Sequence, residues 1–165
     1  MLNSVSLSLS SKIHIALFSI ALVLLGSSVI MFSKDEKQLM TTLAKDKLES
    51  LAVNYFDSIN TMMLTGMMAN RQILQEKILK QKGILEAKII RGEQVVKLYG
   101  KGHAGQIAQT SLEKEALTGV KKFQLIENDQ GSVLEFVMPL KGGKSYMGEN
   151  CLSCHQSKEG DVLGA

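Results

Sequence analysis

One uninterrupted apolar run near the amino terminus constrains the fold of this chain more than any other feature. Residues 13–32 read IHIALFSIALVLLGSSVIMF, and His14 is the only ionisable side chain among them. A helix of about 20 residues rises roughly 30 Å, the thickness of a bilayer core. The run therefore predicts a transmembrane anchor at 13–32. A cleaved signal peptide is the lesser interpretation, because the nearest candidate cleavage site, at 26–28, lies inside the run.

The rest of the chain is long enough for one modest domain. The protein has 165 residues, with 19 basic and 16 acidic side chains and a formal charge of +3. The basic residues are interspersed with acidic ones and do not cluster with aromatic residues, so the sequence offers no support for nucleic-acid binding. Lys12 precedes the apolar run while Lys34 and Lys37 follow it, and these charges do not decide the orientation of the anchor.

Helical periodicity dominates residues 34–81. Apolar positions recur at alternating steps of three and four residues, and they form a stripe of Leu48, Ala52, Tyr55, Ile59, Met62 and Gly66. The spacing predicts a long amphipathic helix with a seam for a partner helix, and we expect a homodimer through it. Packing of the helix on the chain's own sheet would explain the stripe almost as well.

Beyond Gly83 the period changes to two, which is typical of strands. Strands are expected at residues 84–91, 94–99, 123–127 and 133–140. The first two would join at Gly92, and the last two would turn through residues 128–131.

A short helix is expected between these two hairpins, near residues 111–118. Thr110 and Glu113 have the spacing of a capping box, and Gly119 suits the carboxyl end of the helix. The order of elements predicts an α+β domain in which the long helix covers a small antiparallel sheet.

The chemistry-bearing motif is Cys151-Leu152-Ser153-Cys154-His155, a C-x-x-C-H sequence. Two thiols three residues apart lie on one side of a helical turn and can form thioethers with the two vinyl groups of a haem, while the adjacent His supplies an axial imidazole to the iron. A redox dithiol or half of a zinc site would also use C-x-x-C. Zinc needs four ligands, and the only other His residues are His14 and His103. We therefore expect one haem c, covalently held by Cys151 and Cys154, with His155 as the proximal iron ligand.

Several shorter stretches accompany this motif. They are INTMMLTG at 59–66, IIRG at 89–92, LYG at 98–100, EAL at 115–117, MPL at 138–140 and KEGDVLGA at 158–165. In this order the chain resembles the periplasmic haem c sensor domains of bacterial methyl-accepting chemotaxis proteins and related receptors. The resemblance covers most of residues 34–165, and its haem motif is the specific part. It implies a PAS-like fold tethered by a transmembrane helix.

The resemblance also implies a location. Haem of this type is attached outside the bacterial inner membrane, which would place residues 33–165 in the periplasm and residues 1–12 in the cytoplasm. In the family the segment after the motif continues into a strand, a second membrane helix and signalling helices, whereas this sequence stops at Ala165. We therefore expect the sensing half of a receptor, either a natural fragment or a truncated one.

A cluster of methionines offers candidates for the sixth iron ligand. Met62, Met63, Met67 and Met68 lie close together in sequence, and a thioether can bind haem iron. Met63 is the first candidate, with Met62 and Met67 as alternatives, although Met also fills irregular cores. The resemblance additionally implies sites with water or an open sixth position. His103 is better explained as a solvated loop residue than as a ligand.

Three functions are compatible with these features. The leading one is a membrane-anchored sensor in which a redox change or a small gas at the haem shifts the domain for chemotaxis-type signalling. The alternative is a membrane-anchored electron-transfer cytochrome, and the third is an interaction module with structural haem. No acid–base pair or activated nucleophile is recognisable in the sequence, so an enzyme is not expected.

Overall fold

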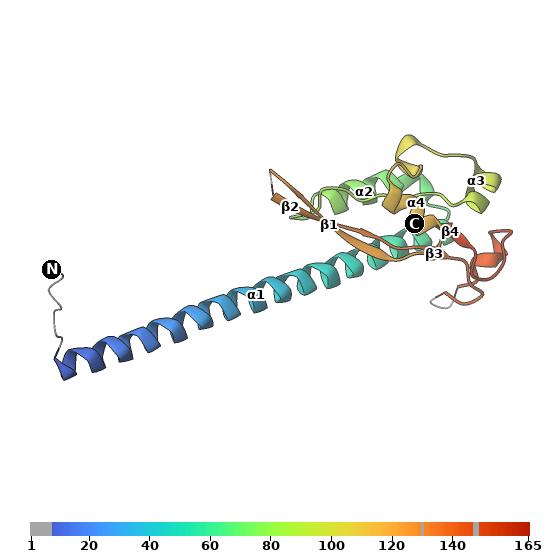
Figure 1. The fold of residues 1–165 in the computed structure, drawn as a ribbon. Coiled ribbons are helices and arrows are strands. Elements are labelled where there is room, and N and C mark those ends of the chain that lie inside the picture. Colours follow the sequence, from blue (N-terminus) through green and yellow to red (C-terminus); the bar gives the residue numbers. More distant parts are fainter. Residues whose placement is uncertain (1–7, 130, 147–148) are drawn as a thin grey trace. The chain divides into compact units, whose positions relative to one another are not determined.

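The structure is a computed structural model that describes residues 8–129, 131–146 and 149–165 (Figure 1). The chain divides into two compact units, Met1–Ala44 and Lys45–Ala165. The elements in chain order are α1 (Leu9–Leu64), η1 (Met68–Asn70), α2 (Arg71–Leu79), α3 (Glu93–Tyr99), η2 (Ala104–Gln106), α4 (Ser111–Leu117), β1 (Lys122–Asn128), β2 (Gly131–Val137), β3 (Leu140–Lys141), η3 (Cys151–Ser153) and β4 (Val162–Gly164). Helices thus combine with small antiparallel sheets, and the predicted α+β class is confirmed.

The apolar run at 13–32 lies in α1, which by length and composition is able to cross a membrane. Its side chains are exposed in the first unit. Its serines satisfy their hydroxyls within the helix: Ser19 donates to the carbonyl of Ile15 and Ser28 to that of Leu24, both at 2.8 Å. Such internal pairing is what an apolar surrounding requires of polar groups.

The carboxyl-terminal part of α1 contributes to the core of the second unit. Tyr55 and Ile59, two residues of the predicted seam, are only 8% and 5% exposed. Phe56 packs edge-to-face on Tyr146, with ring centroids 5.2 Å apart. The seam is therefore occupied within the chain at these positions, and dimerisation through it stays a prediction.

The predicted helix over 34–81 is wrong in its length, because α1 ends at Leu64. Gly66 has a φ of 70°, its N–H donates to the carbonyl of Met63, and the N–H of Met67 donates to that of Met62 at 2.8 Å. This is the bonding pattern of a Schellman motif, in which glycine adopts the left-handed conformation and stops the helix. The chain then turns through η1 into the separate helix α2.

The predicted hairpin at 84–99 is also wrong in its second half, which forms α3. Residues 84–90 are extended outside any named strand, and Ile90 exchanges backbone hydrogen bonds with Ala165 at 2.7 and 3.0 Å. Gly92 then donates to the carbonyl of Leu163 at 2.8 Å. The first segment thus pairs with the end of the chain instead of with its sequence neighbour.

The second predicted hairpin is confirmed as β1 and β2, which pair from Lys122↔Val137 to Asn128↔Gly131. Its predicted turn includes Gln130, which lies outside the described residues. The expected second strand divides before β3, which leaves β2 and pairs with β4 through Leu140↔Gly164. Pro139 precedes β3 and has no N–H to donate, which explains why the ladder stops there.

The predicted short helix is confirmed as α4. The Thr110 hydroxyl accepts from the N–H of Glu113 at 3.1 Å, and the Glu113 carboxylate accepts from the N–H of Thr110 at 2.9 Å. Gly119 follows the helix with a φ of 97°. The capping box and the glycine stop therefore lie where the sequence predicts them.

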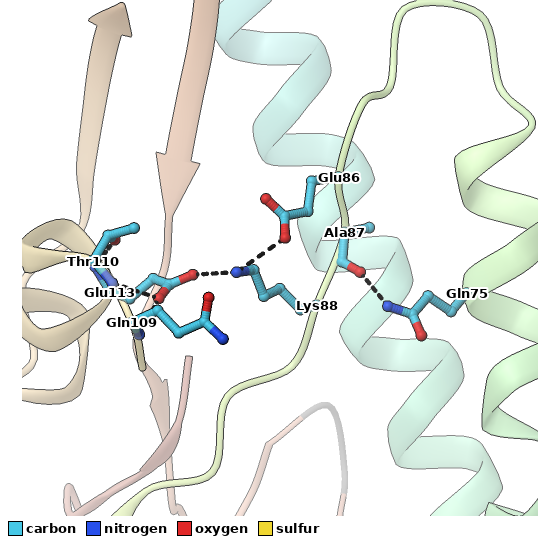
Figure 2. Close-up of polar contacts among 7 residues, drawn as sticks. All are labelled: Gln75, Glu86, Ala87, Lys88, Gln109, Thr110 and Glu113. Carbon is cyan, nitrogen blue, oxygen red and sulfur yellow. Dashed lines mark hydrogen bonds and ion pairs between the residues drawn. The ribbon is translucent and has the colours of Figure 1, made fainter. Parts of the chain in front are cut away.

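A buried ion pair joins α4 to the extended segment before α3 (Figure 2). Glu113 is 3% exposed, and its carboxylate accepts from Lys88 Nζ at 2.7 Å and from the N–H of Gln109 at 2.6 Å. Lys88 also contacts Glu86 at 2.9 Å, and Gln75 of α2 donates to the carbonyl of Ala87 at 2.7 Å. Side chains from both sides thus hold a segment that lacks a full strand ladder.

Candidate functional site

The C-x-x-C-H motif folds as one helical turn in the loop between β3 and β4. Cys151 opens η3, and the N–H of His155 donates to the Cys151 carbonyl at 3.0 Å. The side-chain oxygen of Asn150 caps the turn by accepting from the N–H of Leu152 at 3.1 Å. Side chains three residues apart share one face of such a turn. Both cysteines are free thiols, with Cys151 half-buried and Cys154 exposed.

The loop that carries the motif is closed at its base. Gly142 donates to the carbonyl of Asp161 and accepts from the N–H of Gly160, both at 2.8 Å. A Cβ at Gly142 would lie 3.2 Å from side-chain carbons of Leu152 and Leu163. Glycine therefore allows the motif and β4 to approach one another here.

His155 has the properties expected of an iron ligand. Its side chain is half-buried, and its Nδ1 atom is buried without a hydrogen-bond partner in the part of the chain that the structure describes. Burial lowers the pKa of His155 below its ordinary value, which favours the neutral ring that ligates metals. A buried ring nitrogen without a partner calls for a physical explanation, and it marks this imidazole as a candidate for a functional role. Cys154 directly precedes His155 and Cys151 lies one turn before it, so the residues present are those that haem c requires.

The zinc alternative finds less support. In the part of the chain that the structure describes, no three His, Cys, Asp or Glu side chains come together in a way that could hold a metal ion. Among the described residues, Cys151, Cys154 and His155 are thus not brought together as a three-ligand group, whereas a tetrahedral zinc site needs four ligands.

The candidate distal methionines lie at the carboxyl end of α1. Met63 and Met67 are 37% and 52% exposed, and Met62 is half-buried. Backbone bonds of all three form the Schellman motif that ends the helix. No hydrogen-bonded or aromatic contact found for the described residues joins them to His155, so ligation by Met63 stays a prediction.

Two further polar side chains, His103 and Arg91, have partners within the chain. The Nε2 atom of His103 lies 2.6 Å from Arg71 Nη2, at the start of α2. Arg91, which the hairpin prediction left at a strand end, donates through Nη1 to the carbonyls of Tyr99 and Gly100 at 3.0 and 2.8 Å. Arg91 therefore satisfies carbonyl groups at the end of α3.

Sequence reasoning overlooked two tyrosines that contact this region. Tyr99 packs on His155, and Tyr146 donates its hydroxyl to Asp57 of α1 at 3.2 Å. Burial, together with the charge of Asp57, raises the pKa of Tyr146. An aromatic side chain in a loop rich in Gly, Lys and Ser was the available signal for Tyr146. Met147 next to it lies outside the described residues.

Comparison with known proteins adds no further assignment. No family model, no curated protein and no solved structure matches this chain.

Proposed function

We propose that this chain is a membrane-anchored haem c sensor domain of PAS-like type. Cys151 and Cys154 would hold one haem covalently, and His155 would be the proximal ligand of its iron. The observation that carries the proposal is the helical turn that combines two free thiols with a half-buried imidazole whose Nδ1 atom has no partner among the described residues. The bound haem would supply one-electron redox chemistry and a position for a small gas.

The contact between the motif loop and α1 supports a role in sensing. Tyr146 lies five residues before Cys151, and its ring and hydroxyl contact Phe56 and Asp57 of α1. Because α1 is continuous from Leu9 to Leu64, it also contains the apolar run. A displacement of the motif loop would therefore act on the helix that reaches the proposed membrane segment.

The proposed location follows from the haem. Attachment outside the bacterial inner membrane would place residues 33–165 in the periplasm, residues 13–32 in the bilayer and residues 1–12 in the cytoplasm. The proposal further includes a homodimer, which the helical spacing at 48–66 suggests, and a small gas or redox partner at the haem.

Electron transfer is the second candidate function, and one observation favours it. Cys154 is exposed, so a haem attached there would have an edge near solvent, where a redox partner could reach it. Binding of carbon monoxide separates the candidates. If ferrous haem binds carbon monoxide, its sixth position is exchangeable, which supports sensing. If ferrous haem does not bind the gas, electron transfer is supported.

Covalent attachment is tested by expressing the full chain with a c-type maturation system. We expect the mass of one added haem and haem staining after denaturing electrophoresis. Cys151→Ser and Cys154→Ser should each lose one thioether and retain less haem, whereas Ser153→Ala, which changes the residue between them, should retain it. An unmodified mass of the wild-type chain contradicts the proposal.

Topology is tested with reporter fusions placed after Lys34. At this position, a reporter that works only in the periplasm should be active, and a reporter that works only in the cytoplasm should be silent. The reverse pattern would exclude both the proposed orientation and haem attachment by the periplasmic system.

A further inference from the structure

Tyr99, the last residue of α3, contacts the motif from a segment far away in sequence. Its ring packs edge-to-face on the His155 ring, with centroids 5.9 Å apart and an interplanar angle of 79°. Its hydroxyl donates to the backbone carbonyl of Cys154 at 3.2 Å, a long distance for such a bond. Tyr99 thus contacts both residues that end the motif.

The backbone of Tyr99 is itself held in place. Arg91 donates to the carbonyls of Tyr99 and Gly100, and the N–H of Gly100 donates to the carbonyl of Val96 at 2.9 Å. The N–H of Arg91 donates to the carbonyl of Gln106 at 2.9 Å, which ties the arginine to the next loop. These hydrogen bonds hold the backbone at the end of α3, to which the Tyr99 ring is attached.

The imidazole of His155 has few other constraints. Its backbone is held by the hydrogen bond to Cys151, but its Nδ1 atom has no hydrogen-bond partner among the described residues. Metal-bound imidazoles usually owe their orientation to a hydrogen bond from the second ring nitrogen. The edge-to-face contact with Tyr99 is a contact with the His155 ring itself, so it can restrict the orientation of that ring.

We propose that Tyr99 is a positioning residue of the haem centre, whose ring orients the imidazole of His155 and keeps water away from it. This inference rests on the proposed function, because the orientation of His155 matters to iron only if haem is bound. Tyr99 acts through His155 and is not a ligand. Water near the proximal ligand stabilises the additional positive charge of ferric iron, so a ring that excludes water favours the ferrous form.

The test is a redox titration of the haem-loaded full chain in detergent, in which an external donor supplies one electron to ferric iron. In Tyr99→Leu we expect the ferric-to-ferrous ratio at the wild-type midpoint to rise about tenfold, equivalent to about 59 mV for a one-electron couple. Tyr99→Phe keeps the ring and should restore a ratio within about twofold of wild type. Lys97→Ala is the matched control, because it removes an exposed ion pair with Glu93 from the same helix.

Absorption spectra and thermal unfolding of the same proteins distinguish an effect of Tyr99 on the orientation of His155 from an effect on the stability of the fold. Tyr99 is 57% exposed, so its replacement removes little buried surface and folding should survive. If Tyr99→Leu does not accumulate, Tyr99→Ser takes its place with the same expected shift.

The outcomes separate the two proposals. A wild-type chain without haem contradicts the proposed function and this inference with it. A loaded wild-type chain whose Tyr99→Leu variant has an unchanged ratio and spectrum overturns the role of Tyr99 alone, whatever its unfolding temperature. A shift of equal size in Lys97→Ala, or in Tyr99→Phe, overturns it as well, because helix stability or the hydroxyl would then be responsible.

Discussion

Replacement of Glu113 by glutamine tests whether the buried ion pair holds the second unit together. The carboxylate is almost fully buried and accepts from Lys88 Nζ at 2.7 Å and from the amides of Gln109 and Thr110 at 2.6 and 2.9 Å. Glu113→Gln preserves the size of the side chain but removes its charge. The amide would present an N–H to Lys88 or to a backbone donor, so one contact of the group would be lost outright.

The expected cost follows from these contacts. Breaking a buried ion pair costs about 3–5 kcal/mol, and a hydrogen bond to a charged group contributes about 1.5–3 kcal/mol. Lys88 keeps its contact with Glu86, which is largely exposed to solvent, and this should reduce the loss. We expect Glu113→Gln to lower the free energy of unfolding by about 2–4 kcal/mol, and the melting temperature by roughly 10 °C.

Urea unfolding of the full chain in mild detergent, followed by tyrosine fluorescence, measures this change, since Tyr55 lies in the core. Glu115→Gln is the matched control on the same helix. The Glu115 ion pair with Lys122 has both side chains nearly half exposed, so its loss should cost less than about 1 kcal/mol. If both variants lose the same stability, the buried pair does not have the proposed role.

The pH dependence gives a second check. Burial alone would raise the pKa of Glu113, but hydrogen bonds from Lys88 and the amides of Thr110 and Gln109, with the charge of Lys88, hold it below its ordinary value of 4.5. Burial likewise opposes the charge of Lys88, yet its bonds to Glu113 and Glu86 raise its pKa above 10.5. The contribution of Glu113 is therefore fully present above its ordinary value and is lost as the pH falls through the folded pKa. That of Lys88 is fully present below 10.5 and is lost as the pH rises further. The difference between wild type and Glu113→Gln should be constant near neutral pH and should vanish in acid.

Two further substitutions test the packing of Gly92 on β4 and the methionine assignment. A Cβ at Gly92 would lie 2.5 Å from the carbonyl oxygen of Val162, so Gly92→Ala should destabilise the chain by about 1–3 kcal/mol in urea unfolding. Gly105 has open space at its Cβ, so Gly105→Ala should change stability by less than about 0.5 kcal/mol. Met63→Leu should convert a low-spin haem spectrum to high-spin and strengthen carbon monoxide binding, while Met40→Leu should leave both unchanged. If Met62→Leu or Met67→Leu has this effect instead, the ligand is that residue, and if none has, the methionines only end the helix.

The elements that the sequence predicts correctly are those set by local chemistry. The capping box of α4 needs only Thr110, Glu113 and the glycine after the helix, and all three act within one or two turns. The β1–β2 hairpin likewise joins neighbouring segments, with Phe123 stacked on Phe136 at 4.3 Å. The helical turn of the C-x-x-C-H motif is local in the same sense.

The two errors have different causes, a distant partner in one case and a local glycine conformation in the other. Residues 94–99 alternate sufficiently to suit a strand, but no strand is available to pair with them, because the backbone of Ile90 and Gly92 already bonds to Ala165 and Leu163. The segment therefore satisfies its own backbone groups as a helix. Gly66 was visible as a single glycine, but only its left-handed conformation shows that it stops α1.

The residues of the candidate site show the same difference between local and distant contacts. Cys151, Cys154 and His155 are candidates from the sequence alone, because five consecutive residues match the pattern of haem attachment. Tyr99 and Tyr146 are not, since each reaches the motif region across a long stretch of chain, Tyr99 to Cys154 and Tyr146 to Asp57. The methionine cluster shows that candidate ligands can also have a structural role, because the backbone groups of these residues form the Schellman motif at the end of α1. A local motif thus suggests a cofactor, whereas the side chains that contact the motif from distant segments are found only in the folded chain.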